Sequence, residues 1–410
     1  MRTLYNILTY IVDFHLRIIA LFHAKIRLGL QGRKRTFSEI NDGFKEEDNV
    51  LWFHCASLGE YEQGLPVFEE IKLLYPDHKV LLSFFSPSGY EIKKHTPIAD
   101  LVIYLPLDTN SNARRFVKTV NPDLTVFVKY EIWPNYLLEL KKGGHRTILI
   151  SALFRQDQTY FKSIGKWIKG AMLAFEHIFV QNIHSKELLE LHGFDNVSVS
   201  GDTRFDRVFD QLEMDNVLPF IEEFKDEKLC VVAGSTWPED EKLLTHFINN
   251  STHDCKYIIA PHNIKPQQIK ELKESIDRPT VLFSEQNEQN LADFQVLILD
   301  TIGLLSKTYY YASIAYVGGA MGTTGLHNTL EAAVFDNPII IGNNYEKFPE
   351  ATEMISGGGM FAISDQTELD QIMNELIEND EKRLATGQFN YEYILKNKGA
   401  VIQIREYLRK

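Results

Sequence analysis

Short apolar runs alternate with helical segments along most of this chain, and the alternation starts twice. The first series has apolar runs at residues 50–55, 80–85, 101–105, 124–128, 147–150 and 177–181. The second series has them at residues 229–233, 257–260, 281–283, 296–299, 313–317 and 338–342. Strands that alternate with helices form parallel sheets covered on both faces. The sequence therefore predicts an α/β protein with two Rossmann-like domains, which we expect to face a cleft.

The boundary between the two series lies in a charged connection over residues 210–228, which lacks a strong apolar pattern. A chain of 410 residues is long enough for two or three domains. We therefore predict a terminal segment over residues 1–35, a first domain over residues 36–214 and a second domain over residues 215–410.

The first 35 residues are basic, although the whole chain has a net charge of −13. Read as a helix, they place polar and apolar side chains on opposite stripes. The polar stripe contains Arg2, Asn6, Thr9, Asp13 and Arg17, and the apolar stripe contains Leu4, Ile7, Ile11, Phe14, Ile18 and Phe22. The charges within this run argue against a membrane-spanning helix and against a signal peptide. We expect an amphipathic helix with a basic tail, residues 33–35, on an anionic membrane surface; the alternative is a helix packed on its own domain.

Charge and cysteine usage exclude two classes of function. The acidic balance argues against nucleic acid as a partner. The three cysteines, Cys55, Cys230 and Cys255, are scattered, so neither a disulfide framework nor a zinc site is predicted. We expect no metal site of any kind, because no His, Cys and Asp residues recur at ligand spacing.

Polar residues follow the ends of the strands in the first series, where ligands of parallel sheets bind. They are His54, Ser57 and Glu60 after the first strand, Ser86 after the second, and Glu131 after the fourth. A carboxylate in such a loop is a candidate general base. Helix capping is the alternative for Glu60 and for Glu131, because acids stabilise helix N-termini.

A glycine-rich loop follows the strand at residues 313–317. It contains Gly318, Gly319, Gly322 and Gly325, and residues 328–331 then open a short apolar helix. Glycines let a backbone approach a ligand, and a helix start attracts anions, so we expect a phosphate or carboxylate seat here. The spacing matches neither the P-loop nor the GxGxxG pattern. The alternative is a tight turn capped by Asn328, with Glu331 completing the cap.

Five segments, in order, resemble motifs of the Kdo transferases of lipopolysaccharide synthesis. Residues 54–60 resemble HSVSVGE, and residues 130–135 resemble TELWPN. Gly234, Ser235 and Thr236, followed by Glu241, resemble the opening of that family's second domain. Residues 317–319 and 325–331 resemble VGGS and GGHNPLEAA, and residues 342–348 resemble GPHxxNF.

This resemblance implies a GT-B fold and transfer of Kdo from CMP-Kdo to a lipid A precursor at the cytoplasmic face of the bacterial inner membrane. It implies an inverting reaction without metal or cofactor, with Glu60 as the general base and Glu131 as the next candidate. The implied donor-binding residues are Ser235, Thr236, His262, Gly318, Gly319, His327, Asn328 and Glu331. The implied acceptor-binding residues are His54, Ser57, Gly59 and Ser86, and Arg204 stands where the family commonly has a lysine.

The chain departs from the family motifs at three places near the donor. Leu326 replaces a glycine, Asn343 and Asn344 replace the proline and histidine of GPH, and residues 261–263 lack the arginine of a PRH motif. Two other functions stay open at this point. One is a sugar-nucleotide epimerase of the same two-domain type, and the other is a non-catalytic nucleotide-binding membrane adaptor.

Overall fold

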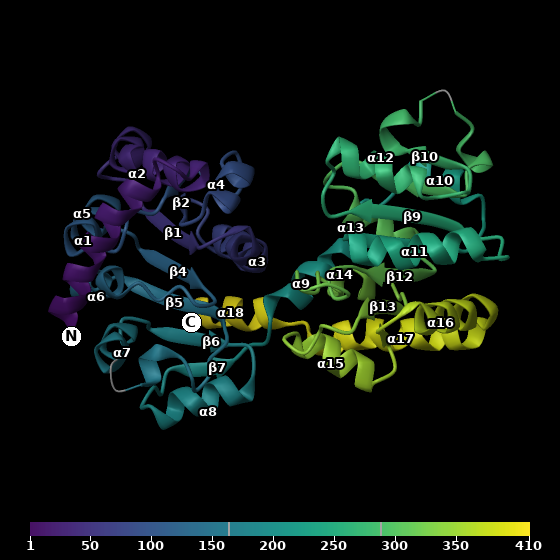
Figure 1. Cartoon of the computed structure of the whole chain (residues 1–410). Coiled ribbons are helices and arrows are strands. Elements are labelled where there is room, and N and C mark those ends of the chain that lie inside the picture. The colour runs from purple at the N-terminus through teal and green to yellow at the C-terminus, as the bar shows by residue number, and fades with distance from the viewer. Residues whose placement is uncertain (163–164, 288) are drawn as a thin grey trace. The chain divides into compact units, whose positions relative to one another are not determined.

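The computed structural model in Figure 1 describes residues 1–162, 165–287 and 289–410 as two units. Unit 1 comprises Met1–Arg207 and Lys398–Lys410, and unit 2 comprises Val208–Asn397. These units differ from the predicted domains in two respects. The break lies before residue 215, and residues 398–410 belong to unit 1 rather than to the second half of the chain.

The strands of unit 1 form one parallel seven-stranded sheet in the order β3-β2-β1-β4-β5-β6-β7. They are β1 (Val50–Cys55), β2 (Lys79–Phe84), β3 (Leu101–Tyr104), β4 (Leu124–Val128), β5 (Arg146–Ala152), β6 (His177–Val180) and β7 (Val197–Val199). Every residue of β1 and of β4 is buried. Uninterrupted apolar strands are typical of a parallel sheet that helices cover on both faces, which confirms the predicted fold class for this unit.

Unit 2 has a second parallel seven-stranded sheet, in the order β10-β11-β9-β8-β12-β13-β14. Its strands are β8 (Cys230–Thr236), β9 (Lys256–Pro261), β10 (Thr280–Leu282), β11 (Val296–Ile298), β12 (Ile314–Val317), β13 (Ile339–Gly342) and β14 (Met360–Ile363). The edge strand β14 has no counterpart among the predicted strands.

Helices pack around the sheet of each unit (Figure 1). Unit 1 contains α1 (Arg2–Ile19), α2 (Ala24–Gly43), α3 (Leu58–Leu74), α4 (Pro87–Lys93), α5 (Asn110–Val120), α6 (Pro134–Gly143), α7 (Lys166–Met172), α8 (Ile183–Leu191) and α18 (Ala400–Leu408), and α9 (Thr203–Phe209) leads to unit 2. Unit 2 contains α10 (Pro219–Lys225), α11 (Pro238–Asn250), α12 (Pro266–Glu274), α13 (Leu305–Thr308), α14 (Leu330–Ala333), α15 (Pro349–Ser356), α16 (Gln366–Glu378) and α17 (Asp380–Asn397).

The first helix, α1, rests on unit 1 through its polar stripe. The Tyr5 hydroxyl donates a hydrogen bond to Oδ2 of Asp108 at 2.6 Å, and Nδ2 of Asn135 donates to Oδ1 of Asn6 at 2.9 Å. The apolar stripe faces outward, with side chains such as Phe14 61% exposed and Ile11 44% exposed. The predicted amphipathic helix is therefore present, and it packs on its own unit with its polar face rather than its apolar face. None of the described helices is long and apolar enough to cross a bilayer.

The predicted basic tail after α1 is wrong, because residues 24–43 form the helix α2, which packs on the sheet. Thr36 donates a hydrogen bond to the Tyr104 carbonyl at 2.7 Å. Arg33 donates from Nε to the Leu105 carbonyl at 3.0 Å and from a terminal nitrogen to the Phe85 carbonyl at 2.5 Å. Arg33 thus fastens α2 to the ends of β2 and β3 and is not a free surface charge.

Candidate functional site

The candidate residues of each unit lie where the strand order of its sheet reverses. In unit 1 the central strand β1 has β2 on one side and β4 on the other, so the loops after β1 and β4 diverge there. In unit 2 the central strand β8 lies between β9 and β12 in the same way. Ligands of open parallel sheets bind in the crevice beyond the strand ends at such a point. Glu60 and Glu131 follow β1 and β4, and the glycine-rich loop follows β12.

Glu60 lies in the first turn of α3, and Ser57 is the residue that directly precedes this helix. The Ser57 hydroxyl donates a hydrogen bond to the Glu60 carboxylate. Glu60 is half-buried and Gly59 is exposed. A Cβ added at Gly59 would meet nothing closer than Ser57 Oγ at 3.9 Å. Packing therefore does not require a glycine here, and the glycine leaves open space near the start of α3.

Glu131 is held in place by two nitrogen donors on one of its oxygens. Nε1 of Trp133 donates to Oε2 at 2.7 Å, and Nε2 of His54 lies 3.1 Å from the same oxygen. The Glu131 side chain is 12% exposed, whereas the His54 side chain is completely buried. His54 therefore reaches the site through Glu131, although the sequence placed it among the acceptor-binding residues.

Cys55, the last residue of β1, is completely buried and is influenced by the charges of both carboxylates. Burial raises the pKa of the Cys55 thiol well above its usual range, and the negative charges of Glu60 and Glu131 raise it further. A fully buried thiol of this kind is inert. Glu60, in the first turn of α3, and Glu131, in contact with His54 of β1, therefore both lie near the carboxyl end of this strand.

The other candidates of unit 1 have structural partners. Ser86 caps α4, where its hydroxyl accepts a hydrogen bond from the Ser88 amide at 3.3 Å. Arg204 forms an ion pair with Asp202, with Nε 2.8 Å from Oδ2. Asp202 also accepts a hydrogen bond from Nε2 of Gln63 in α3 at 2.8 Å. The Arg204–Asp202 pair therefore contacts α3, the helix whose first turn contains Glu60.

Three aromatic side chains meet beyond the strand ends of unit 2. The rings of Trp237 and His262 stack with centroids 4.7 Å apart and planes inclined by 18°. The His327 ring lies 4.6 Å from His262, and Nε1 of Trp237 donates a hydrogen bond to Nε2 of His327 at 3.1 Å. Burial, together with the nearby His262, lowers the pKa of His327 to about 4. His327 is therefore neutral near pH 7, and because its Nε2 accepts, its Nδ1 carries the proton.

The glycine-rich loop is fixed by Asp240, a buried carboxylate on α11. Asp240 accepts hydrogen bonds from the Gly319 amide at 2.9 Å, the Trp237 amide at 2.9 Å and the Tyr316 hydroxyl at 2.8 Å. Burial is the main cause of the raised pKa of Asp240. The Gly318 amide donates to the Gly234 carbonyl at 2.9 Å. Both glycine amides are thus already engaged, and the glycines serve close packing: a Cβ on Gly319, whose φ is +98°, would lie 2.2 Å from the Gly325 carbonyl oxygen.

The expected helix start after this loop is a single turn, since α14 contains only Leu330–Ala333. A helix of four residues has a small dipole, which weakens the predicted anion seat at this point. Asn328 is exposed, and its Oδ1 accepts from the Leu330 amide at 3.2 Å. Glu331 accepts from Nδ2 of Asn328 at 3.0 Å and from the Ser306 hydroxyl at 3.1 Å. The helix is capped by Thr329 without a side-chain hydrogen bond, so the predicted cap at Asn328 is wrong; Asn328 instead forms a local turn that orients Glu331.

The end of β8 has an unusual backbone. Ser235 has a φ of +53°, in the left-handed region that a non-glycine residue adopts at a cost of about 1–3 kcal/mol. The next residue, Thr236, is buried, and its hydroxyl donates to Oε1 of Glu241 at 3.0 Å. Lys129, directly after β4 in unit 1, has a φ of +65°. Strained residues at both switch points agree with ligand sites there, since such strain gathers at binding sites.

Sequence reasoning missed three residues that organise these sites: Asp240, Trp237 and Ser83. Asp240 and Trp237 lie in the segment quoted for its resemblance, three residues apart at the start of α11. A Pro at the helix start with an acid two residues later indicates a cap, but not that the carboxylate also binds a distant loop. Ser83 is a buried residue of β2 that carries no sequence signal beyond interrupting an apolar run.

Comparison with known proteins agrees with the motif resemblance. Residues 27–207 match the family model described as 3-deoxy-D-manno-octulosonic-acid transferase (kdotransferase). The chain is 25% identical over 380 residues to the 3-deoxy-D-manno-octulosonic acid transferase of Haemophilus influenzae, covering 88% of this chain and 86% of that protein. It is 27% identical over 385 residues to the enzyme of the same name from Aquifex aeolicus, covering 92% and 98%.

A solved structure shares the two-unit fold at low sequence identity. It is a UDP-GlcNAc 2-epimerase from Neisseria meningitidis bound to UDP-GlcNAc, with a TM-score of 0.63 and 14% identity, covering 88% of this chain and all of that one. This likeness shows the fold alone and confirms the GT-B type of architecture with two Rossmann-like units. The sequence matches go further: residues 27–207 match the Kdo transferase family model, and along most of its length the chain is similar to curated enzymes of that name.

Proposed function

We propose that this protein transfers Kdo from CMP-Kdo to a lipid A precursor of the lipid IVA type, in lipopolysaccharide core synthesis, with inversion and without metal or cofactor. The observation that carries the proposal is a pair of carboxylates near the carboxyl end of β1, at the switch point of unit 1: Glu60 in the first turn of α3, and Glu131 in contact with His54. The similarity to Kdo transferases suggests the reaction class, and the carboxylates offer the base that the reaction needs.

A sugar hydroxyl is a weak nucleophile, so its proton must be removed as it attacks. In the proposed step Glu60 accepts the proton of the acceptor hydroxyl. The freed electron pair forms a bond to the anomeric carbon of Kdo on the face opposite the leaving group. The bond from that carbon to the phosphate oxygen breaks, and CMP leaves with its electron pair. Ser57, hydrogen-bonded to Glu60, orients the base, and the open space at Gly59 admits the acceptor.

Glu131 has a positioning role in this proposal. Two nitrogen donors already occupy Oε2, which fixes the carboxylate in one orientation. A carboxylate held in this way suits a hydrogen bond to a sugar hydroxyl, whereas the base must be able to take up a proton during each turnover.

We place the donor beyond the strand ends of β8, β9 and β12 in unit 2. The stacked rings of Trp237 and His262 offer a flat surface suited to a nucleobase. Glu331 accepts hydrogen bonds, so it suits the ribose hydroxyls of CMP rather than its phosphate. The neutral His327 can donate from Nδ1 to an anionic oxygen without carrying a charge.

The membrane surface is the proposed location of the reaction, because the acceptor is a lipid. The outward-facing apolar stripe of α1 supports this location, since a helix that packs with its polar side and exposes its apolar side is suited to insertion into a membrane interface. In a bacterial cell this surface is the cytoplasmic face of the inner membrane.

The test is to incubate purified protein with CMP-Kdo and a tetra-acylated lipid A precursor and to weigh the lipid product. We expect added Kdo and released CMP, in the presence of excess EDTA as well as in its absence. Turnover of UDP-GlcNAc to its 2-epimer without lipid product would identify an epimerase instead. Binding of CMP with neither reaction would identify a non-catalytic adaptor.

A further inference from the structure

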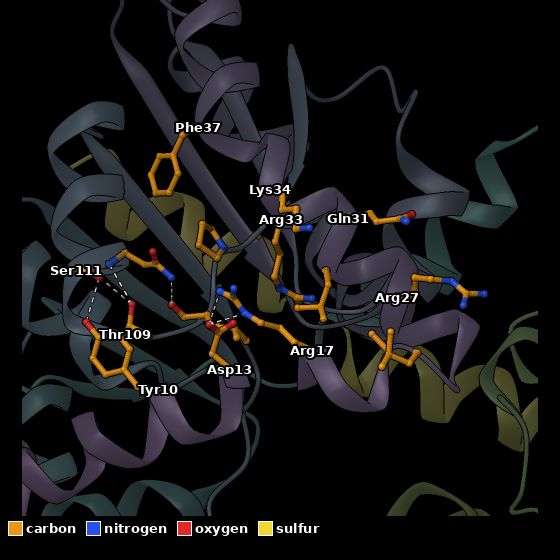
Figure 2. A pocket seen from close by; sticks show the side chains of 16 residues that line it. Tyr10, Asp13, Arg17, Arg27, Gln31, Arg33, Lys34, Phe37, Thr109 and Ser111 are labelled. Atoms are coloured by element: carbon orange, nitrogen blue, oxygen red, sulfur yellow. Dashed lines mark hydrogen bonds and ion pairs between the residues drawn. The ribbon is translucent and has the colours of Figure 1, made fainter. Parts of the chain in front are cut away.

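A pocket of about 570 Å³ lies between α1, α2 and the start of α5, and none of the proposed catalytic or donor-binding residues lines it. Figure 2 shows its lining, to which α1 contributes Tyr10, Asp13 and Arg17, and α2 contributes Arg27, Gln31, Arg33 and Lys34. The segment before α5 and its first turn contribute polar groups, including Thr109, Ser111 and Asn112. The pocket lies wholly within unit 1.

The lining is strongly basic for an acidic protein. It includes four cationic side chains and one carboxylate, although the chain as a whole has a net charge of −13. Asp13 pairs with Arg17 at 2.6 Å, and Arg33 is tied to two backbone carbonyls. Burial lowers the pKa of Arg33 to about 10, which still leaves it charged near pH 7. Arg27 and Lys34 are exposed, and neither side chain forms a hydrogen bond or an ion pair within the part of the chain that the structure describes.

The rim of the pocket is apolar where α1 turns into α2. Leu21 lines the pocket and is 70% exposed, and the adjacent Phe22 is 82% exposed. These two residues continue the exposed apolar stripe of α1. A membrane that receives this stripe therefore places its headgroup layer at the level of the pocket, because phosphate groups lie directly outside the acyl boundary that an interfacial helix occupies.

We propose that this pocket binds the phosphate of an anionic glycerophospholipid headgroup, with Arg27 and Lys34 as its main contacts. The proposal rests on the membrane association proposed above and makes it a specific headgroup site in addition to apolar insertion. Arg offers a planar pair of donors for phosphate oxygens, and Lys offers a point charge. The apolar rim favours a membrane lipid over a free phosphate, since only the lipid has tails to cover Leu21 and Phe22.

The test compares two double variants of α2 that remove the same charge. Arg27→Gln/Lys34→Gln alters the pocket, whereas Lys25→Gln/Arg35→Gln alters exposed residues of the same helix that do not line it. Binding is measured on phosphatidylcholine vesicles with and without phosphatidylglycerol. Both variants lose the general attraction of two surface cations to the anionic vesicles, about 1 kcal/mol each. We expect the affinity of the pocket variant to fall about tenfold further than that of the control, because only the pocket variant also loses the headgroup site. Both variants should bind neutral vesicles as the wild type does.

Three outcomes would overturn the proposal. Equal losses in the two variants would mean that only diffuse charge attracts the protein to the membrane. Unchanged vesicle binding of the pocket variant, with a raised KM for the acceptor presented in detergent, would assign the pocket to the acceptor's own phosphate. Failure of the wild-type protein to bind anionic vesicles would reject the membrane association as well. The transfer reaction of the wild type in detergent remains a separate test of the proposed function.

Discussion

The Nε2 atom of His54 lies 3.1 Å from Oε2 of Glu131, and this contact ends a hydrogen-bonded chain that begins in the core. Nε1 of Trp52 donates to the Ser83 hydroxyl at 2.8 Å, and that hydroxyl lies 2.8 Å from Nδ1 of His54. An indole can only donate, so the Ser83 hydroxyl is free to donate to Nδ1. This places the ring proton on Nε2, where it faces Oε2 of Glu131.

This chain predicts a stability cost for Ser83→Ala, a change of one buried hydroxyl. The Trp52 N–H would lose its partner, and Nδ1 of His54 would keep only the Ser83 carbonyl, at 3.2 Å. An unsatisfied buried polar group costs about 1–3 kcal/mol. We expect urea unfolding to show a loss of that size, together with reduced turnover because Glu131 is held less firmly. The matched control is Ser38→Ala on the exposed face of α2, which we expect to change stability by less than about 0.5 kcal/mol. Equal stability of the two variants would contradict a stabilising role for the hydrogen-bonded chain from Trp52 to Glu131.

Glu60→Gln tests the general base directly. The change preserves shape but removes basicity, and we expect the transfer rate to fall about 10²–10⁴-fold with CMP binding and melting temperature nearly unchanged. Glu62→Gln, on the same helix and bound to Arg207 at the surface, is the control and should retain its activity. If Glu60→Gln keeps nearly full turnover, the base is another group, and Glu131 becomes the next to test.

Two glycines should respond in opposite ways to the same substitution. Gly319→Ala puts a Cβ 2.2 Å from a backbone carbonyl at a positive φ, so we expect it to destabilise unit 2 and to lower CMP affinity only as a consequence. Gly59→Ala meets nothing within 3.9 Å, so we expect normal thermal stability with a raised KM for the acceptor. The comparison needs thermal melts and steady-state kinetics. A Gly59→Ala enzyme with unaltered kinetics would argue against acceptor contact at this loop.

The ionisation of His327 gives a pH dependence with a definite sign. Its folded-state pKa is lowered from 6.5 to about 4, so the unfolded chain takes up a proton at higher pH than the folded one. The contribution to stability is therefore complete above pH 6.5 and is lost as the pH falls toward 4. Imidazole NMR should show His327 neutral through that window, also in His262→Phe, because burial is the first cause. A midpoint near 6.5 would show that the ring is solvated.

The apolar stripe of α1 should govern membrane binding without supporting the fold. Ile11→Gln/Phe14→Gln replaces side chains that are already exposed, so we expect unchanged stability and weaker sedimentation with vesicles. Leu73→Gln/Ile92→Gln changes two equally exposed apolar residues on other helices of unit 1 and serves as the control. Loss of vesicle binding in both variants would point to general surface hydrophobicity instead of a specific helix.

The sequence predicted the buried parallel strands well, because continuous apolar runs such as residues 50–55 and 124–128 identify central strands regardless of context. It failed where a role depends on long-range contact. Arg33 read as a surface charge because its partners, the carbonyls of Phe85 and Leu105, are distant in the chain. Asp240 was missed, since nothing local in the sequence shows that its carboxylate fixes Gly319. The motifs nominated the site residues, but the buried position of His54 and the engaged glycine amides required coordinates.

The return of α18 to unit 1 has a consequence for how the protein matures. Val401, Ile404 and Leu408 belong to the same apolar cluster as Val67 and Phe68 of α3. During synthesis on the ribosome, this face of α3 lacks its α18 contacts until Val208–Asn397 has been made. At about 5–20 residues per second, that delay is on the order of ten to forty seconds. The helix that carries Glu60 therefore reaches its final packing only after residues 398–410 have been synthesised, and deletion of these residues would uncover an apolar face of unit 1.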